Sequence, residues 1–176
     1  MSSQRGLSES RLAVIGDTGA LLARVYYMLP SYKFVFYTTS ACFKEVKDAE
    51  NRETLLNALE LGLVKVVDAG DEYISRAVEE AKSIGELSRL SEADLSVIAL
   101  ALELAGKRNV VVLTDDYSLQ NTLHYLGLSF KPVRTEGIKQ SFRYREYCPV
   151  CGYVPGKPGE KTCPICGSPI RRIRVS

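Results

Sequence analysis

Acidic side chains stand at several points where apolar segments of this chain end. Asp17 follows the apolar run LAVIG, and Asp115 and Asp116 follow VVVLT. Glu45 lies about one turn into a later helical stretch, and Asp94 lies in the first turn of another. If these acids converge, they resist ionisation unless a cation neutralises them. Mg²⁺ or Mn²⁺, held by carboxylates and water, is the usual apparatus for phosphodiester hydrolysis.

Each acid also has an ordinary structural interpretation. Asp17 is placed to cap a helix that begins at Thr18, and Asp94 has the spacing of a capping box with Ser91. Glu45 fits a solvated helix surface. However, the segment that starts at Asp94 is apolar almost all round, which predicts a buried helix where an unpaired carboxylate is costly. We therefore expect a cation site, with capping as the alternative for each single acid.

The segments that must position these acids alternate between strand and helix patterns. Strands are expected at 12–16, 34–37, 63–67, 110–113 and 128–131, and helices at 18–28, 41–48, 53–61, 72–84, 92–105 and 118–126. This alternation predicts an α/β fold with a mostly parallel sheet covered on both faces. Ligands of such sheets bind beyond the carboxyl ends of the strands, so the acids at 17, 115 and 116 are expected at one edge.

Four cysteines near the C-terminus have the spacing of a metal site. The segment CPVCGYVPGKPGEKTCPICG contains Cys148, Cys151, Cys163 and Cys166 as two Cys-x-x-Cys pairs separated by eleven residues. This spacing is typical of a zinc ribbon with one structural ion, with rubredoxin-type iron and a redox dithiol as alternatives. So short a segment has little core, and zinc is expected to supply about 10 kcal/mol or more of its folding free energy. Cys42 stands alone and is expected in the core.

Charge is distributed unevenly along the 176 residues. Residues 1–137 contain 15 basic and 19 acidic side chains, whereas residues 138–176 contain 8 and 2. The basic C-terminal part suits a nucleic-acid ligand, with a merely solvated surface as the alternative. The candidate RNA contacts alternate charge with an aromatic ring ahead of the cysteines or follow them: Lys139, Arg143, Tyr144, Arg145 and, more weakly, Arg171, Arg172 and Arg174.

Several classes of protein are disfavoured by what the sequence lacks. It contains no apolar run near the roughly 18 residues of a membrane span and no signal-peptide pattern, so a cytoplasmic location without membrane partners is expected. A single histidine, His124, makes a serine or cysteine hydrolase a poor candidate. Neither GxxxxGK[ST] nor GxGxxG is present, which disfavours nucleoside-triphosphate and dinucleotide chemistry.

The acidic segments VIGDTGALL, CFKEV, SEADLSVIALA and TDDYSLQ resemble, in order and spacing, the four acidic motifs of the PIN-domain nucleases. The resemblance covers about residues 11–133 and implies a five-stranded parallel sheet in the order 3-2-1-4-5. It implies metal-dependent endonuclease activity on single-stranded RNA. The implied ligands of one or two Mg²⁺ or Mn²⁺ ions are Asp17, Glu45, Asp94 and Asp116, with Thr114 and Asp115 beside them. The choice between Asp115 and Asp116 as the fourth ligand stays open.

A PIN domain followed by a ribbon after SFRYREY is similar to the NIN-one-binding family, which trims the 3′ end of small-subunit ribosomal RNA. The resemblance, in its short archaeal form, implies precursor ribosomal RNA, the immature small subunit and assembly factors as partners. The alternatives are a non-catalytic RNA-binding scaffold and a toxin-like PIN ribonuclease acting on transfer RNA. The expected divisions are a flexible N-terminus (1–10), a PIN nuclease domain (11–137), a basic and aromatic linker (138–147), a zinc ribbon (148–172) and a tail (173–176).

Overall fold

A computed structural model describes residues 11–175 of the chain, so the expected flexible N-terminus lies outside the described residues. Its main feature is a five-stranded sheet in the order β3-β2-β1-β4-β5, with every neighbouring pair parallel. The strands are β1 (Leu12–Gly16), β2 (Phe34–Thr38), β3 (Val64–Val66), β4 (Val110–Leu113) and β5 (Phe130–Lys131). The predicted α/β class and strand order are confirmed.

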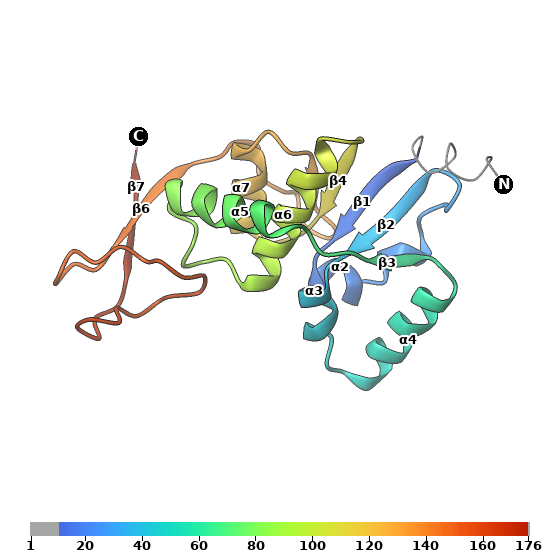
Figure 1. Cartoon of the computed structure of the whole chain (residues 1–176), viewed down its shortest axis with the longest axis horizontal. Helices are drawn as coiled ribbons and strands as arrows, with labels where there is room; N and C mark the ends of the chain where they lie inside the picture. The colour runs from blue at the N-terminus through green and yellow to red at the C-terminus, as the bar shows by residue number, and fades with distance from the viewer. Residues whose placement is uncertain (1–10, 176) are drawn as a thin grey trace.

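Helices connect these strands and cover the sheet (Figure 1). They are α2 (Thr18–Leu22), the 3₁₀ turn η1 (Val25–Tyr27), α3 (Ser40–Glu45), α4 (Ala49–Glu60), α5 (Asp71–Ser83), α6 (Glu92–Ala105) and α7 (Tyr117–Tyr125). The most apolar of them, α6, packs against β1, β4 and the neighbouring helices α3, α5 and α7. Its residues from 95 to 101 are all buried, which confirms the buried helix expected from its sequence.

The first helix is shorter than the expected 18–28. Arg24 adopts a left-handed conformation with φ of 54°, which ends the α-helix and leaves only a 3₁₀ turn after it. Its guanidinium is held in place by Glu50 at 2.8 Å and by Asn51 at 3.0 Å. These partners belong to α4, so the break depends on tertiary contacts that the local pattern does not contain.

The C-terminal region forms a separate antiparallel pair of strands, β6 (Arg143–Tyr147) and β7 (Arg171–Val175). The structure thus shows paired strands at residues that the sequence analysis assigned in part to a linker (138–147) and a tail (173–176). Exposed and less exposed side chains alternate along most of β6, which is the period of a strand with two different faces. Figure 1 shows the pair leaving the body of the molecule on the side away from β3.

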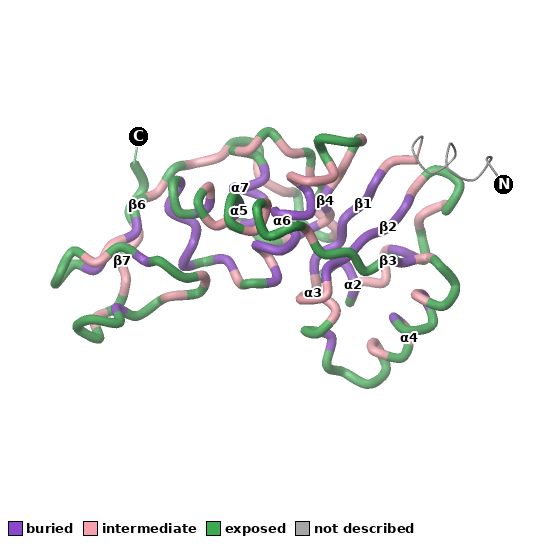
Figure 2. The backbone as a smooth tube through the Cα atoms, viewed as in Figure 1, coloured by how far each residue is buried: buried purple, intermediate pink, exposed green. Residues whose placement is uncertain are grey.

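The buried residues follow the sheet and α6, whereas most of the C-terminal region is exposed (Figure 2). The exceptions there include Cys148, Cys163 and Glu146. Cys42 lies in the main core, as expected, with 1% of its surface exposed. Within residues 11–175, no helix combines the length and the apolar character required to cross a membrane.

Candidate active site

The first and fourth strands bring two acidic segments together at the carboxyl edge of the sheet. β1 and β4 pair with Gly16 opposite Leu113, so Asp17 and Thr114 follow at equivalent positions just beyond the sheet. The N–H of Asp17 donates to the carbonyl of Leu113 over 3.3 Å. Thr114 is fully buried, and its hydroxyl accepts a 3.0 Å bond from the N–H of Asp116. The topology thus places residues 17 and 116 at the same edge.

Asp17 and Asp116 both cap helices that begin at this edge. Oδ1 of Asp17 accepts a 2.7 Å bond from the N–H of Ala20 at the start of α2. Oδ1 of Asp116 accepts a 2.7 Å bond from the N–H of Leu119 at the start of α7. Each cap uses one carboxylate oxygen and fixes the direction of the other. Capping and cation binding are therefore compatible roles for these two residues.

Asp94 and Glu45 reach the same region from α6 and α3. The predicted capping box is present, because Oδ2 of Asp94 accepts a 2.8 Å bond from the N–H of Ser91, and the hydroxyl of Ser91 accepts a 3.1 Å bond from the N–H of Asp94. Oε2 of Glu45 accepts a 2.6 Å bond from the hydroxyl of Thr18, the residue after Asp17. Although Glu45 is exposed, this bond ties it to the first helix of the candidate site.

The pKa shifts of Asp17 and Asp94 show that the charges of the neighbouring acids act on them. Burial raises the pKa of Asp17, and the charges of Asp115 and Asp116 raise it further, although hydrogen bonds oppose them. Burial also raises the pKa of Asp94, and the charges of Asp116 and Asp17 add to this increase. A nearby cation favours the ionised form of such carboxylates. The cluster therefore has the electrostatics of a site for a hard divalent cation with oxygen ligands.

Asp115 is engaged elsewhere. Its carboxylate accepts bonds from the N–H groups of Val133 at 2.8 Å, Arg134 at 3.0 Å and Thr135 at 3.2 Å, and from the Thr135 hydroxyl at 3.1 Å. Burial by itself would raise the pKa of Asp115, but these bonds lower it. The geometry therefore favours Asp116 as the acid that faces the site and makes Asp115 the anchor of the segment after β5.

The acids are less tightly grouped than a closed set of metal ligands. Of the His, Cys, Asp and Glu side chains between residues 11 and 175, only the four cysteines place three or more ligand atoms within 4.8 Å of one another. Mg²⁺ dehydrates reluctantly and usually keeps several waters beside one or two carboxylates. Carboxylates spaced this far apart suit an ion that binds some of them directly and others through water molecules.

The four cysteine sulfurs lie closer together than the carboxylates of the acidic residues do. The sulfurs of Cys148 and Cys166 lie 3.4 Å apart, and those of Cys151 and Cys163 lie 3.5 Å apart. Tetrahedral zinc with bonds of about 2.3 Å requires sulfur separations of roughly 3.8 Å. Bonds from the side chain and backbone of Ser168 lower the pKa of Cys166 to about 6. For Cys151, a backbone bond from Tyr153 lowers the pKa, but bonds with the neighbouring cysteines outweigh it and raise the pKa to about 12. A bound zinc ion favours the thiolate form of its cysteines. The four sulfurs therefore fit one zinc ion.

The two strands beside this cluster have an outer and an inner face. Arg143 and Arg145 alternate with Tyr144 along β6, and Arg171 precedes Arg172 on β7. The three outer arginines at 143, 145 and 171 are exposed. In contrast, the N–H of Tyr144 donates to the carbonyl of residue 84 over 2.7 Å, and the guanidinium of Arg172 stacks 3.3 Å from the Tyr144 ring. The inner residues therefore attach the strands to the α/β body.

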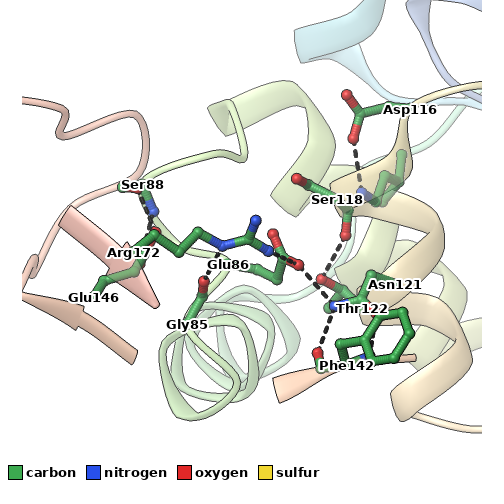
Figure 3. A network of polar contacts seen from close by, with 11 residues as sticks. Gly85, Glu86, Ser88, Asp116, Ser118, Asn121, Thr122, Phe142, Glu146 and Arg172 are labelled. Carbon is green, nitrogen blue, oxygen red and sulfur yellow. Dashed lines mark hydrogen bonds and ion pairs between the residues drawn. The ribbon is translucent and has the colours of Figure 1, made fainter. Parts of the chain in front are cut away.

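A buried polar network makes that attachment (Figure 3). Arg172 forms an ion pair with Glu86, and Asn121 of α7 donates to the same carboxylate over 2.7 Å. Beside them, the hydroxyl of Ser88 donates to the buried carboxylate of Glu146. The sequence analysis missed Glu86, Ser88, Asn121 and Glu146, because their partners lie 35 to 86 positions away and no local pattern signals them.

Comparison with known proteins agrees with this geometry. The family described as the PIN domain of ribonuclease matches residues 14–104. The chain belongs to the PIN-domain family. "Endoribonuclease Nob1" of Pyrococcus abyssi is 40% identical over 139 residues, which cover 78% of this chain and 83% of that protein.

Two further relatives show the breadth of the family. "Ribonuclease VapC3" of Aeropyrum pernix is 39% identical over 77% of this PIN-domain chain and 96% of its own length. "20S-pre-rRNA D-site endonuclease NOB1" of Saccharomyces cerevisiae is 37% identical over 55% of this chain, although the match covers only 21% of that longer protein. The chain is thus a Nob1-like PIN protein with relatives that carry toxin-type names.

Proposed function

We propose that this PIN protein is a divalent-metal-dependent endoribonuclease that cleaves precursor small-subunit ribosomal RNA at its 3′ end. Residues 11–137 would carry the chemistry, and residues 148–172 would form a ribbon around one zinc ion. The immature small subunit and its assembly factors would be the partners. The relatives named for Nob1 and for 20S pre-rRNA support the choice of substrate.

The observation that carries the proposal is the mutual perturbation of the acids at the carboxyl edge of the sheet. Burial is the largest cause that raises the pKa of Asp17 and of Asp94, and the charges of their acidic neighbours raise it further. A purely structural set of helix caps gains nothing from such repulsion, because each cap needs only one carboxylate. Perturbed carboxylates in one place are typical of a functional site.

Asp17, Asp94, Asp116 and Glu45 would hold one or two Mg²⁺ or Mn²⁺ ions. Such ions, when bound, activate a water for in-line attack and neutralise charge on the leaving oxygen. The chain's own contribution is orientation, because the caps at Ala20, Ser91 and Leu119 fix one oxygen of each aspartate. Thr114 couples two of these acids, since its hydroxyl bonds to the N–H of Asp116 and lowers the pKa of Asp17.

The outer face of β6 and β7 would guide RNA to these acids. Arg143, Arg145 and Arg171 are exposed there, and Lys139 is exposed in the segment before β6. Arginine and lysine attract the phosphates of single strands, and the nearby Tyr147 ring offers a face for a base. Arg172 stacks on the Tyr144 ring and pairs with Glu86 on the inner face, so we expect these two residues to contribute less to RNA binding than the exposed arginines.

The test is cleavage of a short RNA that spans the 3′ junction of the small-subunit RNA. The full chain is incubated with that RNA with Mn²⁺ and without added divalent ions, and its zinc content is measured in parallel. Cleavage that requires Mn²⁺ and is lost in Asp116→Asn, while Asp115→Asn retains it, supports the proposal. Binding without cleavage in Mn²⁺ would favour the non-catalytic scaffold.

A toxin-like PIN ribonuclease acting on transfer RNA is the competing function, and the similarity to "Ribonuclease VapC3" favours a ribonuclease of that kind. The same assay with folded transfer RNA separates the two possibilities. The basic strands β6 and β7 and the four-cysteine cluster favour a large ribosomal substrate, because they extend the contact surface well beyond the acidic edge. Faster cleavage of transfer RNA than of the small-subunit junction would overturn the proposed substrate.

A further inference from the structure

Two acids of the candidate site lie on helices that contact each other. Glu45 is the last residue of α3, Asp94 lies in the first turn of α6, and the two helices pack together. An ion that both carboxylates hold needs them at a defined separation, because Mg²⁺ demands near-ideal octahedral geometry. The contacts that fix α3 against α6 therefore decide how well the two acids suit the ion.

A pair of buried hydroxyls joins these two helices. Oγ1 of Thr39 and Oγ of Ser96 lie 2.7 Å apart, although the two residues are 57 positions apart in the sequence. Thr39 is fully buried, and Ser96 is only 9% exposed. Thr39 is the N-cap of α3, and Ser96 follows Asp94 by two residues on α6. The pair therefore connects the start of one acid-bearing helix to the start of the other.

The neighbours of this pair fix the direction of its hydrogen bond. Oγ of Ser96 donates to the carbonyl of Ala93 over 2.6 Å. A hydroxyl has only one proton, so Ser96 has none left for Thr39, and Thr39 is the donor between the two. Oγ1 of Thr39 in turn accepts a 3.2 Å bond from the N–H of Cys42. One chain of bonds thus runs from an N–H of α3 through both hydroxyls to a carbonyl of α6.

Neither helix needs the bond between the hydroxyls for its own structure. The cap of α3 uses only the acceptor of the Thr39 hydroxyl, and α6 has its own capping box at Ser91. What the bond adds is direction. Apolar packing between helices is non-directional, whereas an O–H···O bond holds its two oxygens between about 2.5 and 3.0 Å apart. The hydroxyl pair thus fixes how α3 lies against α6.

We propose that Thr39 and Ser96 are positioning residues, which set the separation of the Glu45 and Asp94 carboxylates for the catalytic ion. The inference rests on the proposed ribonuclease function and adds two residues to it. Each hydroxyl acts through the acid on its own helix rather than by contact with the ion or the RNA. Residues that support metal ligands in this way typically change metal affinity or activity by 10- to 100-fold. The expected signature is weaker binding of the ion, with little change in the reaction once the ion is bound.

The test is a titration of the zinc-loaded full chain with Mn²⁺ in the absence of RNA. Free Mn²⁺ is measured by electron paramagnetic resonance, because the ion loses its sharp solution signal when it binds. Ser96→Ala and Thr39→Val should each raise the Kd for Mn²⁺ about tenfold. Thr39→Ser keeps the hydroxyl and should bind Mn²⁺ as wild type does. Unchanged affinity in folded Ser96→Ala and Thr39→Val overturns the proposal.

Ser88→Ala is the matched control for a general loss of stability. The Ser88 hydroxyl is also buried and hydrogen-bonded, but its partner is Glu146 in the attachment of β6. Ser88→Ala should therefore lower the melting temperature without changing the Kd for Mn²⁺. An equal rise of Kd in Ser88→Ala and Ser96→Ala would overturn the proposal, because it would trace the effect to stability alone.

The double variant Thr39→Val/Ser96→Ala tests whether the two hydroxyls act as a pair. Its Kd for Mn²⁺ should rise no further than in the single variants, because the first substitution already breaks the bond. A rise equal to the product of the two single effects overturns the pairing. The double variant also replaces Ser96→Ala if that protein is unfolded, since apolar replacement of both partners leaves neither hydroxyl unpaired. Wild-type affinity in the double variant then overturns the proposal.

Cleavage distinguishes this inference from the function on which it rests. Single-turnover cleavage of RNA is measured over a range of Mn²⁺ concentrations. In Ser96→Ala, the Mn²⁺ concentration that gives half the maximal rate should rise with the Kd, while the maximal rate stays within a few-fold of wild type. Absence of Mn²⁺-dependent cleavage by wild type would refute the proposed function. Cleavage by wild type with the same Mn²⁺ requirement in Ser96→Ala would refute only the positioning role.

Discussion

The acidic edge of the sheet and the four-cysteine cluster both have metal-type ligands, but they hold them in different ways. The cysteine sulfurs lie within 4.8 Å of one another, so the cluster is nearly closed around a central point. The aspartates are held apart by helix caps that bind one oxygen each. Closed sites are typical of structural metals, whereas catalytic sites keep positions open for water and substrate. From this difference we expect that the ribbon would depend on a bound ion for folding, whereas the acidic edge would not.

The largest effect is therefore expected in the ribbon. Cys148→Ser removes a ligand that is buried between the two Cys-x-x-Cys turns, and it should release about one equivalent of zinc. Structural zinc contributes on the order of 10 kcal/mol or more to small domains of this kind, so residues 148–172 should unfold. Zinc content by elemental analysis and protease resistance of the C-terminal region measure the result.

Cys42→Ser is the matched control for this experiment. Cys42 is buried in the main core and is not part of the cysteine cluster, so its substitution should leave the zinc content unchanged. Iron in place of zinc in the wild-type protein would contradict the assignment of the ion. Retention of zinc in Cys148→Ser would contradict the role of the cysteine.

At the acidic edge, a ligand variant should separate activity from stability. Asp17→Asn removes the charge of a proposed metal ligand but retains a good helix cap, since asparagine and aspartate cap almost equally well. Cleavage should fall by more than about 100-fold, because even residues that only support a metal ligand are worth 10- to 100-fold. Single-turnover cleavage in Mn²⁺ measures this loss.

Whereas the cleavage activity of Asp17→Asn should fall, its folding stability should stay the same or rise, and this change should depend on pH. The pKa of Asp17 is raised in the folded chain, so the folded state binds this proton more tightly than the unfolded state does. Ionisation of Asp17 therefore lowers stability as the pH rises from the unfolded pKa through the raised folded value. In metal-free buffer, Asp17→Asn should melt at the same temperature as wild type or higher at pH 7, and the gain should vanish near pH 3. A large loss of melting temperature with activity retained would show that Asp17 is only a cap.

The sequence predicted the acidic edge well because its positions follow from topology. Asp17 and Asp116 come directly after strands whose apolar runs are plain, and parallel strands place their carboxyl ends together. The alternative of capping was also correct, since Asp17 caps α2 and Asp94 completes the capping box that Ser91 begins at α6. What the sequence left open was the choice between Asp115 and Asp116, because the N–H groups that occupy Asp115 belong to residues 133–135, beyond β5.

The attachment of the ribbon was not predictable in this way. Glu86 and Arg172 are separated by 86 positions, and each alone looks like an ordinary charged surface residue. The conformation at Gly85, with φ of 69°, reflects the same attachment, because a Cβ there would lie 2.1 Å from the carbonyl oxygen of Tyr144. Residues 143–147 were expected in a linker and not as a strand, and which of their side chains turn inward depends on these distant partners.

A smaller effect is expected from the outer face of the ribbon. Replacing Arg143 and Arg145 by alanine should weaken RNA binding and reduce its salt dependence, because both side chains are exposed on β6. Each lost phosphate contact lowers the slope of log affinity against log salt by roughly 0.7 for single strands, so the double variant should lose about 1.4. Lys65→Ala, on the far edge strand β3, is the control and should leave the slope unchanged. Equal slopes in all three proteins would mean that this face docks protein rather than RNA.

The smallest effect is expected at Asp115, and it distinguishes the two neighbouring aspartates. Asp115→Asn weakens the bonds to the N–H groups of Val133, Arg134 and Thr135 and should cost about 1 kcal/mol of stability at pH 7, as measured by urea unfolding. Because these bonds lower the pKa of Asp115, its stabilisation is present above the unfolded pKa of 3.8 and is lost as the pH falls through the lower folded value. The difference between wild type and variant should therefore shrink below pH 4.

The cleavage activity of Asp115→Asn should stay within a few-fold of wild type. In contrast, Asp116→Asn should lose cleavage activity without this change in stability. If Asp115→Asn instead abolished cleavage at unchanged stability, Asp115 would be the metal ligand, and its bonds to residues 133–135 would contribute little to stability.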